Sequence, residues 1–151
     1  MLDVVAGLPV HPLLVHATVV LVPLIGLLVA AAAVWPTLRR RAGWLTGVLG
    51  VLAVGLTWVT IQAGEAFEQR LGMTVAEHSA AGRALLPWAA GVAVAGLAIS
   101  WWGTRTGRRS VSRPLVALIV AAGLVAGLGS VVMTVRAGHT GATSVWGGVA
   151  G

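Results

Sequence analysis

The sequence predicts an all-α integral membrane protein, a four-helix bundle whose helices cross a lipid bilayer. Three observations lead to this prediction. Hydrophobic residues make up 58% of the 151 residues and charged residues only 9%, and the mean hydropathy is +0.94, which is not the composition of a soluble domain. Four apolar stretches are each long enough to cross a bilayer core, which takes about 20 helical residues. Arginines gather in two of the three connections between these stretches.

The expected membrane spans cover residues 12–34, 44–63, 84–102 and 114–135. The first span begins at Pro12, whose missing N–H costs nothing at the first position of a helix. No basic segment precedes this span and it is too long for the core of a signal peptide, so we expect it to remain in the mature protein. The spans and their connections fill the chain, so residues 1–151 are expected to form one domain.

Charge divides the connections between two sides of the membrane. Seven of the ten basic residues lie in the connections after the first and third spans: Arg39, Arg40, Arg41, Arg105, Arg108, Arg109 and Arg113. By the positive-inside rule these short basic connections face the cytoplasm, which places both termini outside (N-out, C-out) in the inner (plasma) membrane. Because the arginines flank apolar spans, contact with anionic lipid accounts for the net charge of +6, and nucleic acid is not expected as a partner.

The spans form two helical hairpins, joined outside by residues 64–83, and the residues of the two hairpins do not repeat convincingly. Part of residues 64–83 is expected to be helical, since Phe67, Leu71 and Val75 recur at four-residue spacing, and this helix could lie flat over the mouth of the bundle. Two Gly-x-x-x-Gly segments, at residues 43–47 and 123–127, are spaced for close helix packing in lipid.

Histidines and acidic residues gather at the predicted outer end. They are His11, His16, His78, His139, Asp3, Glu65, Glu68 and Glu77. His16 lies inside the first span, where a side chain facing lipid is costly, so it is expected to point into the bundle or a wet cavity. His11 and His16 differ by about 140° around a helix and are not expected to hold one small ion together. Gly138 and Gly141 flank His139 and leave room beside it for a flat cofactor or a second helix.

The chain has no cysteine, so a metal or cofactor would be held by His, Glu, Asp or Met. Four imidazoles at one depth suit b-type haem, a transition-metal ion or proton-linked gating, and the alternative is that they cap helices and bond to one another. We expect His16 and His139 to ligate the haem or the ion. His11 and His78 would form a second pair or support the first. Glu77, beside His78, is expected to join these ligands if the group is a metal ion.

Three segments carry a resemblance to a known family: GLPVHPLLVHATVVLVPL near the start, Glu77-His78, and GHTGATSVWGG near the end. Over nearly its whole length the chain resembles the uncharacterised bacterial membrane family catalogued as domain of unknown function 2231. Members are four-span proteins with a His-Pro-x-x-x-His segment, here His11 to His16, and a Gly-His-x-Gly segment, here Gly138 to Gly141. Relatives joined to c-type cytochrome or Rieske-type iron–sulfur domains imply a redox setting. The family's second glycine after the histidine is Ala142 here, so a pocket shaped by this segment would differ.

Two functions are consistent with these residues. In the first, the histidine cluster relays electrons between a membrane quinol and an extracytoplasmic redox partner of cytochrome or Rieske type. In the second, the protein is a non-enzymatic scaffold or assembly subunit with structural histidines. A hydrolase is disfavoured because no serine lies in an elbow motif. Transport is disfavoured because one protomer has His16 alone as an ionisable group within a span, although an oligomer could build a pore.

Overall fold

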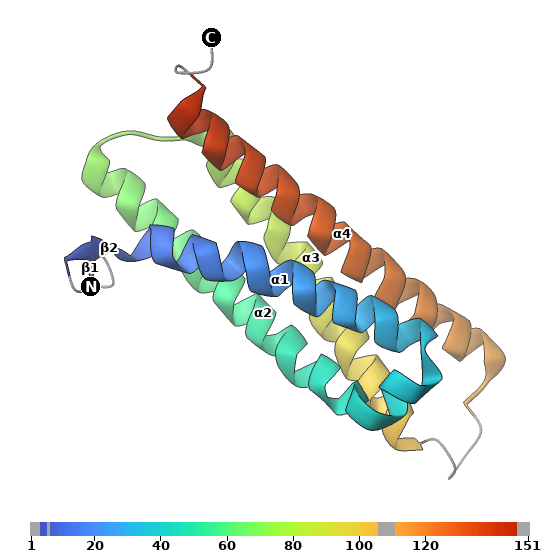
Figure 1. Ribbon diagram of the computed structural model, residues 1–151. Helices are drawn as coiled ribbons and strands as arrows, with labels where there is room; N and C mark the ends of the chain where they lie inside the picture. The colour runs from blue at the N-terminus through green and yellow to red at the C-terminus, as the bar shows by residue number, and fades with distance from the viewer. Residues whose placement is uncertain (1–3, 6, 106–110, 148–151) are drawn as a thin grey trace.

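Four long helices form the structure, a computed structural model that describes residues 4–5, 7–105 and 111–147 (Figure 1). In chain order the elements are β1 (Val4–Val5), β2 (Leu8–Pro9), α1 (Val10–Val34), α2 (Pro36–Leu71), α3 (Ala76–Arg105) and α4 (Arg113–Trp146). The two short strands pair antiparallel around Gly7, whose φ of 80° suits a glycine. Asp3, Arg108 and Arg109 lie outside the described residues. All four helices are long and apolar enough to cross a membrane, so the predicted four-helix membrane bundle is confirmed.

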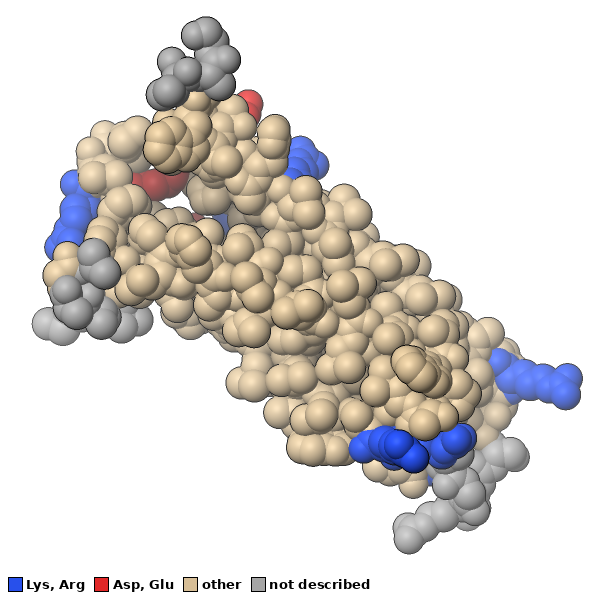
Figure 2. Space-filling view, viewed as in Figure 1, with Lys and Arg blue, Asp and Glu red and all other residues tan. Residues whose placement is uncertain are grey.

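Each helix packs against two neighbours, α1 and α3 both lying against α2 and α4. The start of α1, the α2–α3 turn and the end of α4 lie at one end of the bundle, and the other two connections lie at the opposite end (Figure 1). On the face shown in Figure 2, acidic side chains lie only near the end with the α2–α3 turn, whereas the opposite end carries arginines alone. This charge distribution is the one from which the N-out, C-out orientation was predicted, and the orientation itself stays a prediction.

The helices continue well beyond the expected spans. α2 includes residues 64–71 and α3 begins at Ala76, so only residues 72–75 connect them. The prediction of helix in this region is right for residues 67–71, but the idea that it lies flat over the bundle is wrong because nothing breaks α2 before Gly72. Gly72 has a φ of 63°, and this left-handed conformation ends the helix. Likewise α4 continues to Trp146, so His139 lies within a helix instead of after one.

The helices are longer than the hydrocarbon core is thick. The 36 residues of α2 extend roughly 54 Å at 1.5 Å per residue, against about 30 Å of hydrocarbon. The apolar residues 44–63 are therefore the part of α2 that spans the membrane, and the last two turns of α2 lie outside it. The α2–α3 turn and its side chains belong to the aqueous end of the bundle.

Small residues bring the helices together at the middle of the bundle. A Cβ added to Gly26 of α1 would lie 2.8 Å from the carbonyl oxygen of Gly127 of α4. A Cβ added to Gly50 of α2 would lie 2.7 Å from the Cα of Ala93 of α3. The glycine spacing noted in the sequence thus serves close packing of helix backbones, which stabilises helix pairs in lipid.

Arg39 departs from the expectation for the basic connections. It is 9% exposed, and its Nη1 donates hydrogen bonds to the carbonyl oxygens of Ala32, at 3.1 Å, and Ala33, at 2.9 Å. Its guanidinium lies over the ring of Trp102, 3.4 Å from the centroid. The last carbonyls of α1 have no partner within the helix, and Arg39 supplies one. Arg39 therefore holds the end of α1 instead of contacting lipid, while Arg40 and Arg41 are exposed as expected.

Candidate functional site

His11 and His78 come together at the end of the bundle that holds the α2–α3 turn. His11 is the second residue of α1 and His78 the third of α3, and both side chains are half-buried. Their ring centroids are 6.1 Å apart and the ring planes meet at 71°. The structure thus joins the two histidines that the sequence assigned to a second or supporting pair.

Each of these imidazoles is held by a backbone carbonyl of a neighbouring helix. The Nδ1 of His11 lies 3.2 Å from the carbonyl oxygen of Thr60 on α2, and the Nδ1 of His78 lies 3.2 Å from that of Ala137 on α4. A carbonyl oxygen only accepts, so each Nδ1 carries the proton and donates it. In the neutral ring the lone pair is then on Nε2. Within the described part of the chain, no hydrogen bond reaches the Nε2 of either ring.

Two glycines provide the surfaces on which the rings lie. A Cβ on Gly64 would lie 2.9 Å from the Cε1 of His11, and a Cβ on Gly141 would lie 3.0 Å from the Cε1 of His78. Glycine at both positions lets each imidazole approach the helix backbone and reach the carbonyl one turn earlier. The sequence indicated that Gly141 makes room for an imidazole, but it assigned that imidazole to His139 rather than to His78.

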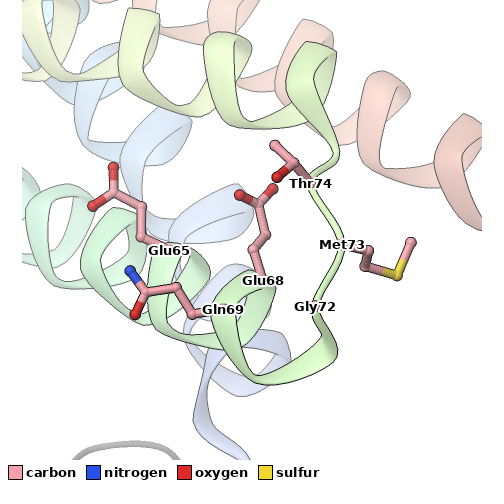
Figure 3. A pocket seen from close by; sticks show the side chains of 6 residues that line it. All are labelled: Glu65, Glu68, Gln69, Gly72, Met73 and Thr74. Carbon is pink, nitrogen blue, oxygen red and sulfur yellow. The ribbon is translucent and has the colours of Figure 1, made fainter.

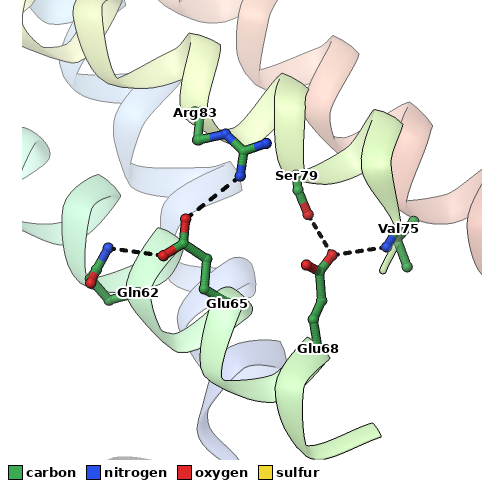
Figure 4. Close-up of polar contacts among 6 residues, drawn as sticks. All are labelled: Gln62, Glu65, Glu68, Val75, Ser79 and Arg83. Carbon is green, nitrogen blue, oxygen red and sulfur yellow. Dashed lines mark hydrogen bonds and ion pairs between the residues drawn. The ribbon is translucent and has the colours of Figure 1, made fainter. Parts of the chain in front are cut away.

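An aromatic ring and a carboxylate complete the surroundings of His11. Phe67 stacks on it, with centroids 6.1 Å apart and planes 25° from parallel. The Glu68 carboxylate accepts hydrogen bonds from the Ser79 hydroxyl and from the Val75 N–H, the latter at 3.0 Å (Figure 4). These two bonds, that from Ser79 first, lower the pKa of Glu68, and the carboxylate is near enough to interact electrostatically with both histidines. Glu68 therefore ties the α2–α3 turn together and adds negative charge beside the pair.

A cavity of about 350 Å³ opens beside this turn (Figure 3). Its lining residues are Glu65, Glu68, Gln69, Gly72, Met73 and Thr74. Glu65 accepts a hydrogen bond of 3.4 Å from Gln62 and pairs with Arg83 at 3.6 Å (Figure 4). No histidine lines this cavity, so it is an acidic recess next to the pair and not a chamber between the two rings.

His16 and His139, the pair expected to bind the cofactor, are both exposed. The expectation that His16 points into the bundle is wrong. His16 lies two residues before the buried Thr18, and His139 two residues after the buried Ala137, so each is about 200° around its helix from a buried neighbour. The Nδ1 of His16 donates to the carbonyl oxygen of Pro12, at 2.6 Å, and leaves its Nε2 facing outward.

Glu77 is exposed as well, and among the described residues no group of three His, Asp or Glu side chains is arranged to hold a metal ion. The expected four-ligand set of His16, His139, His78 and Glu77 is therefore not assembled. Sequence reasoning missed the partners that orient the central pair, above all the carbonyls of Thr60 and Ala137. Backbone acceptors leave no signal in residue types or their spacing.

A family model described as "Predicted membrane protein (DUF2231)" matches residues 7–151. Because this match covers almost all of the chain, the protein belongs to the DUF2231 family, as the sequence resemblance indicated. No curated protein and no solved structure matches the chain.

Proposed function

We propose that this membrane protein binds one transition-metal ion between His11 and His78. The observation that carries the proposal is the shared orientation of the rings, each with Nδ1–H on a backbone carbonyl and the Nε2 lone pair unused. Metal-binding histidines usually donate their other ring N–H to a carbonyl or carboxylate, which fixes the tautomer and the ring. The two imidazoles are therefore in the state that a metal ion requires before it binds.

The distance between the rings fits a single ion. A histidine nitrogen lies about 2.0–2.1 Å from a bound metal ion, and the centre of the ring lies roughly 1 Å further away. Two rings on opposite sides of one ion would then have centroids about 6 Å apart. The observed separation is 6.1 Å.

The surroundings favour a small ion over haem. Axial histidines of a b-type haem have a similar separation, but a macrocycle needs a wide slot between them. Here His11 also stacks on Phe67, and the described cavity lies at the α2–α3 turn. A haem would have to separate Phe67 and the turn from the rings, whereas an ion would not.

We further propose that the ion serves membrane electron transfer. His11 lies just outside the first membrane span and His78 well before the third, so the pair is placed at the membrane surface. A quinol headgroup and an extracytoplasmic protein of cytochrome or Rieske type both reach that depth. The nearby Glu68 carboxylate would favour the more oxidised, more positive state of the ion.

Metal analysis of single-histidine variants tests the binding proposal. The purified protein would be loaded separately with copper, zinc and iron salts, desalted and analysed for metal per chain. His11→Ala and His78→Ala should each lose the stoichiometric ion, and His16→Ala and His139→Ala should keep it. These last two are matched controls because both residues are exposed histidines at the same end.

Three results would contradict the binding proposal. Loss of metal only in the His16→Ala and His139→Ala variants would restore the pair expected from the sequence. A Soret band that depends on the histidines would establish haem. An unchanged metal content of zero in all variants, each folded by circular dichroism, would favour the scaffold function.

A further inference from the structure

The two hairpins, α1–α2 and α3–α4, are equivalent halves. His11 of α1 lies on Gly64 and bonds the carbonyl four residues earlier, at Thr60, on α2. In the same way His78 of α3 lies on Gly141 of α4 and bonds the carbonyl four residues before that glycine. The offset is 67 residues between the histidines (78 − 11) and 77 residues between the glycines (141 − 64).

The same two offsets relate the helix crossings at the middle of the bundle. Gly26 on α1 contacts Gly127 on α4, and Ala93 on α3 contacts Gly50 on α2. Gly26 and Ala93 are 67 residues apart (93 − 26), and Gly50 and Gly127 are 77 residues apart (127 − 50). The contacts of one half are thus reproduced by the other half at both levels of the bundle.

The buried faces follow this correspondence. In α1 the buried residues Thr18, Val22, Ile25, Val29 and Ala32 correspond to Leu85, Ala89, Val92, Gly96 and Ile99, which are buried in α3. In α2 the buried residues Thr46, Gly50, Ala53, Thr57 and Thr60 correspond to Gly123, Gly127, Ser130, Thr134 and Ala137, which are buried in α4. The bundle therefore has a pseudo-two-fold axis along its length, as in membrane proteins built from parallel repeats.

The axis passes between equivalent residues, so it passes between the rings of His11 and His78. An ion held by both rings lies on the axis and sees two equivalent ligands. Both ligands are neutral imidazoles, because each bonds a carbonyl through Nδ1 and keeps Nε2 free. This equivalence limits the kind of ion that the site can hold.

From this symmetry we infer that the ion is monovalent copper, bound between the two Nε2 atoms with two-fold, near-linear coordination. The inference rests on the proposed metal site and names its ligand. In the described part of the chain no third His, Asp or Glu completes a metal site, and Glu68 is already engaged by Ser79 and Val75. The chain has no cysteine that could be a further ligand.

Coordination number and charge both select this ion. Zinc sites generally take four ligands, and calcium or magnesium six or more, mostly oxygen atoms. Monovalent copper is soft, accepts nitrogen ligands and is stable with only two of them. Two neutral, half-buried imidazoles supply no negative charge, so one positive charge costs less to desolvate there than two.

Anaerobic titration with Cu(I) against a colorimetric Cu(I) chelator, and a parallel titration with Zn(II), would test the inference. The full chain should bind one Cu(I), and Zn(II) at least about 100-fold more weakly. His11→Ala and His78→Ala should each abolish Cu(I) binding, and by the same factor, because the ligands are equivalent. X-ray absorption of the copper complex should show two nitrogen neighbours.

The outcomes separate this inference from the proposed site. If Zn(II) or Fe(II) binds more tightly than Cu(I) and with the same dependence on both histidines, the copper inference is overturned and the site stands. Three or four light-atom neighbours around copper would overturn the two-coordinate geometry. If neither ion depends on His11 and His78, both the site and its ligand are wrong.

Discussion

Replacing Arg39 with alanine should destabilise the basic end of the bundle by about 3 kcal/mol. The guanidinium donates two hydrogen bonds to otherwise unpaired carbonyls of α1 and lies over Trp102. Hydrogen bonds from a charged donor contribute about 1.5–3 kcal/mol each, and a cation–π contact about 0.5–2 kcal/mol. Both bonds come from a single Nη1 atom at the membrane surface, where water competes once the side chain is removed, so we take a value near the lower end of their sum.

The free energy of unfolding would be measured by titrating the protein in detergent micelles with sodium dodecyl sulfate and following helicity. Arg39→Lys keeps the charge but loses the planar overlap with Trp102, and it should cost about half as much. Arg40→Ala is the matched control because Arg40 is exposed, and its effect should stay within about 0.5 kcal/mol. If Arg39→Ala costs no more than Arg40→Ala, Arg39 does not hold the end of α1.

Three further predictions concern the other end and the middle of the bundle. Gly141→Ala should push the imidazole of α3 off its carbonyl and weaken metal binding about 10–100-fold, while Gly138→Ala, with nothing within 4 Å of the added Cβ, should leave the affinity unchanged in a Cu(I) titration. Gly50→Ala should cost about 1–3 kcal/mol in the unfolding titration because the added carbon meets the backbone of α3, whereas Gly55→Ala, which has open space, should be neutral. The lowered pKa of Glu68 means that its carboxylate stabilises the fold fully above the pKa of an ordinary glutamate and loses this effect as the pH falls through the lowered value, so the α2–α3 turn should exchange amide hydrogen faster in acid. Glu68→Gln should remove that dependence on pH, and an acid response equal to that of the unaltered protein would contradict the role given to the carboxylate.

The sequence predicted the bundle because long apolar stretches have few alternatives in a bilayer. It underestimated helix length, since polar residues such as those at 64–71 lower the hydropathy without breaking a helix. The end of α2 depends on Gly72, one glycine among 21 in the chain, and its special role is visible only from its left-handed backbone. Arg39 was misplaced for a related reason. An arginine at a membrane surface reads the same in sequence whether it faces lipid or a helix end.

The candidate site was predicted to the correct end of the bundle but with the wrong histidines. A count of charged and polar residues locates the aqueous end, whereas the direction of each side chain depends on helix rotation. His16 was assigned to the interior from its depth in the sequence, yet it lies about 200° from the buried Thr18. His11 was set aside because it precedes Pro12, but α1 already begins at Val10, which places the ring against α2.

The pseudo-symmetry explains why the two kinds of histidine differ. At the offset of the histidine pair, His16 of α1 corresponds to Arg83 of α3, and at the offset of the glycines, His139 of α4 corresponds to Gln62 of α2. In the α2–α3 interface, Arg83 and Gln62 both contact Glu65, whose counterpart in α4 is Ala142. The lateral positions thus carry different chemistry in the two halves, and a site there has no need of symmetry. On the axis, a single ligand contacts both halves at once, so a change in one half alone would leave that ligand with unequal partners. That the axial residues are histidine in both halves, on a glycine in both halves, is what a shared ligand requires.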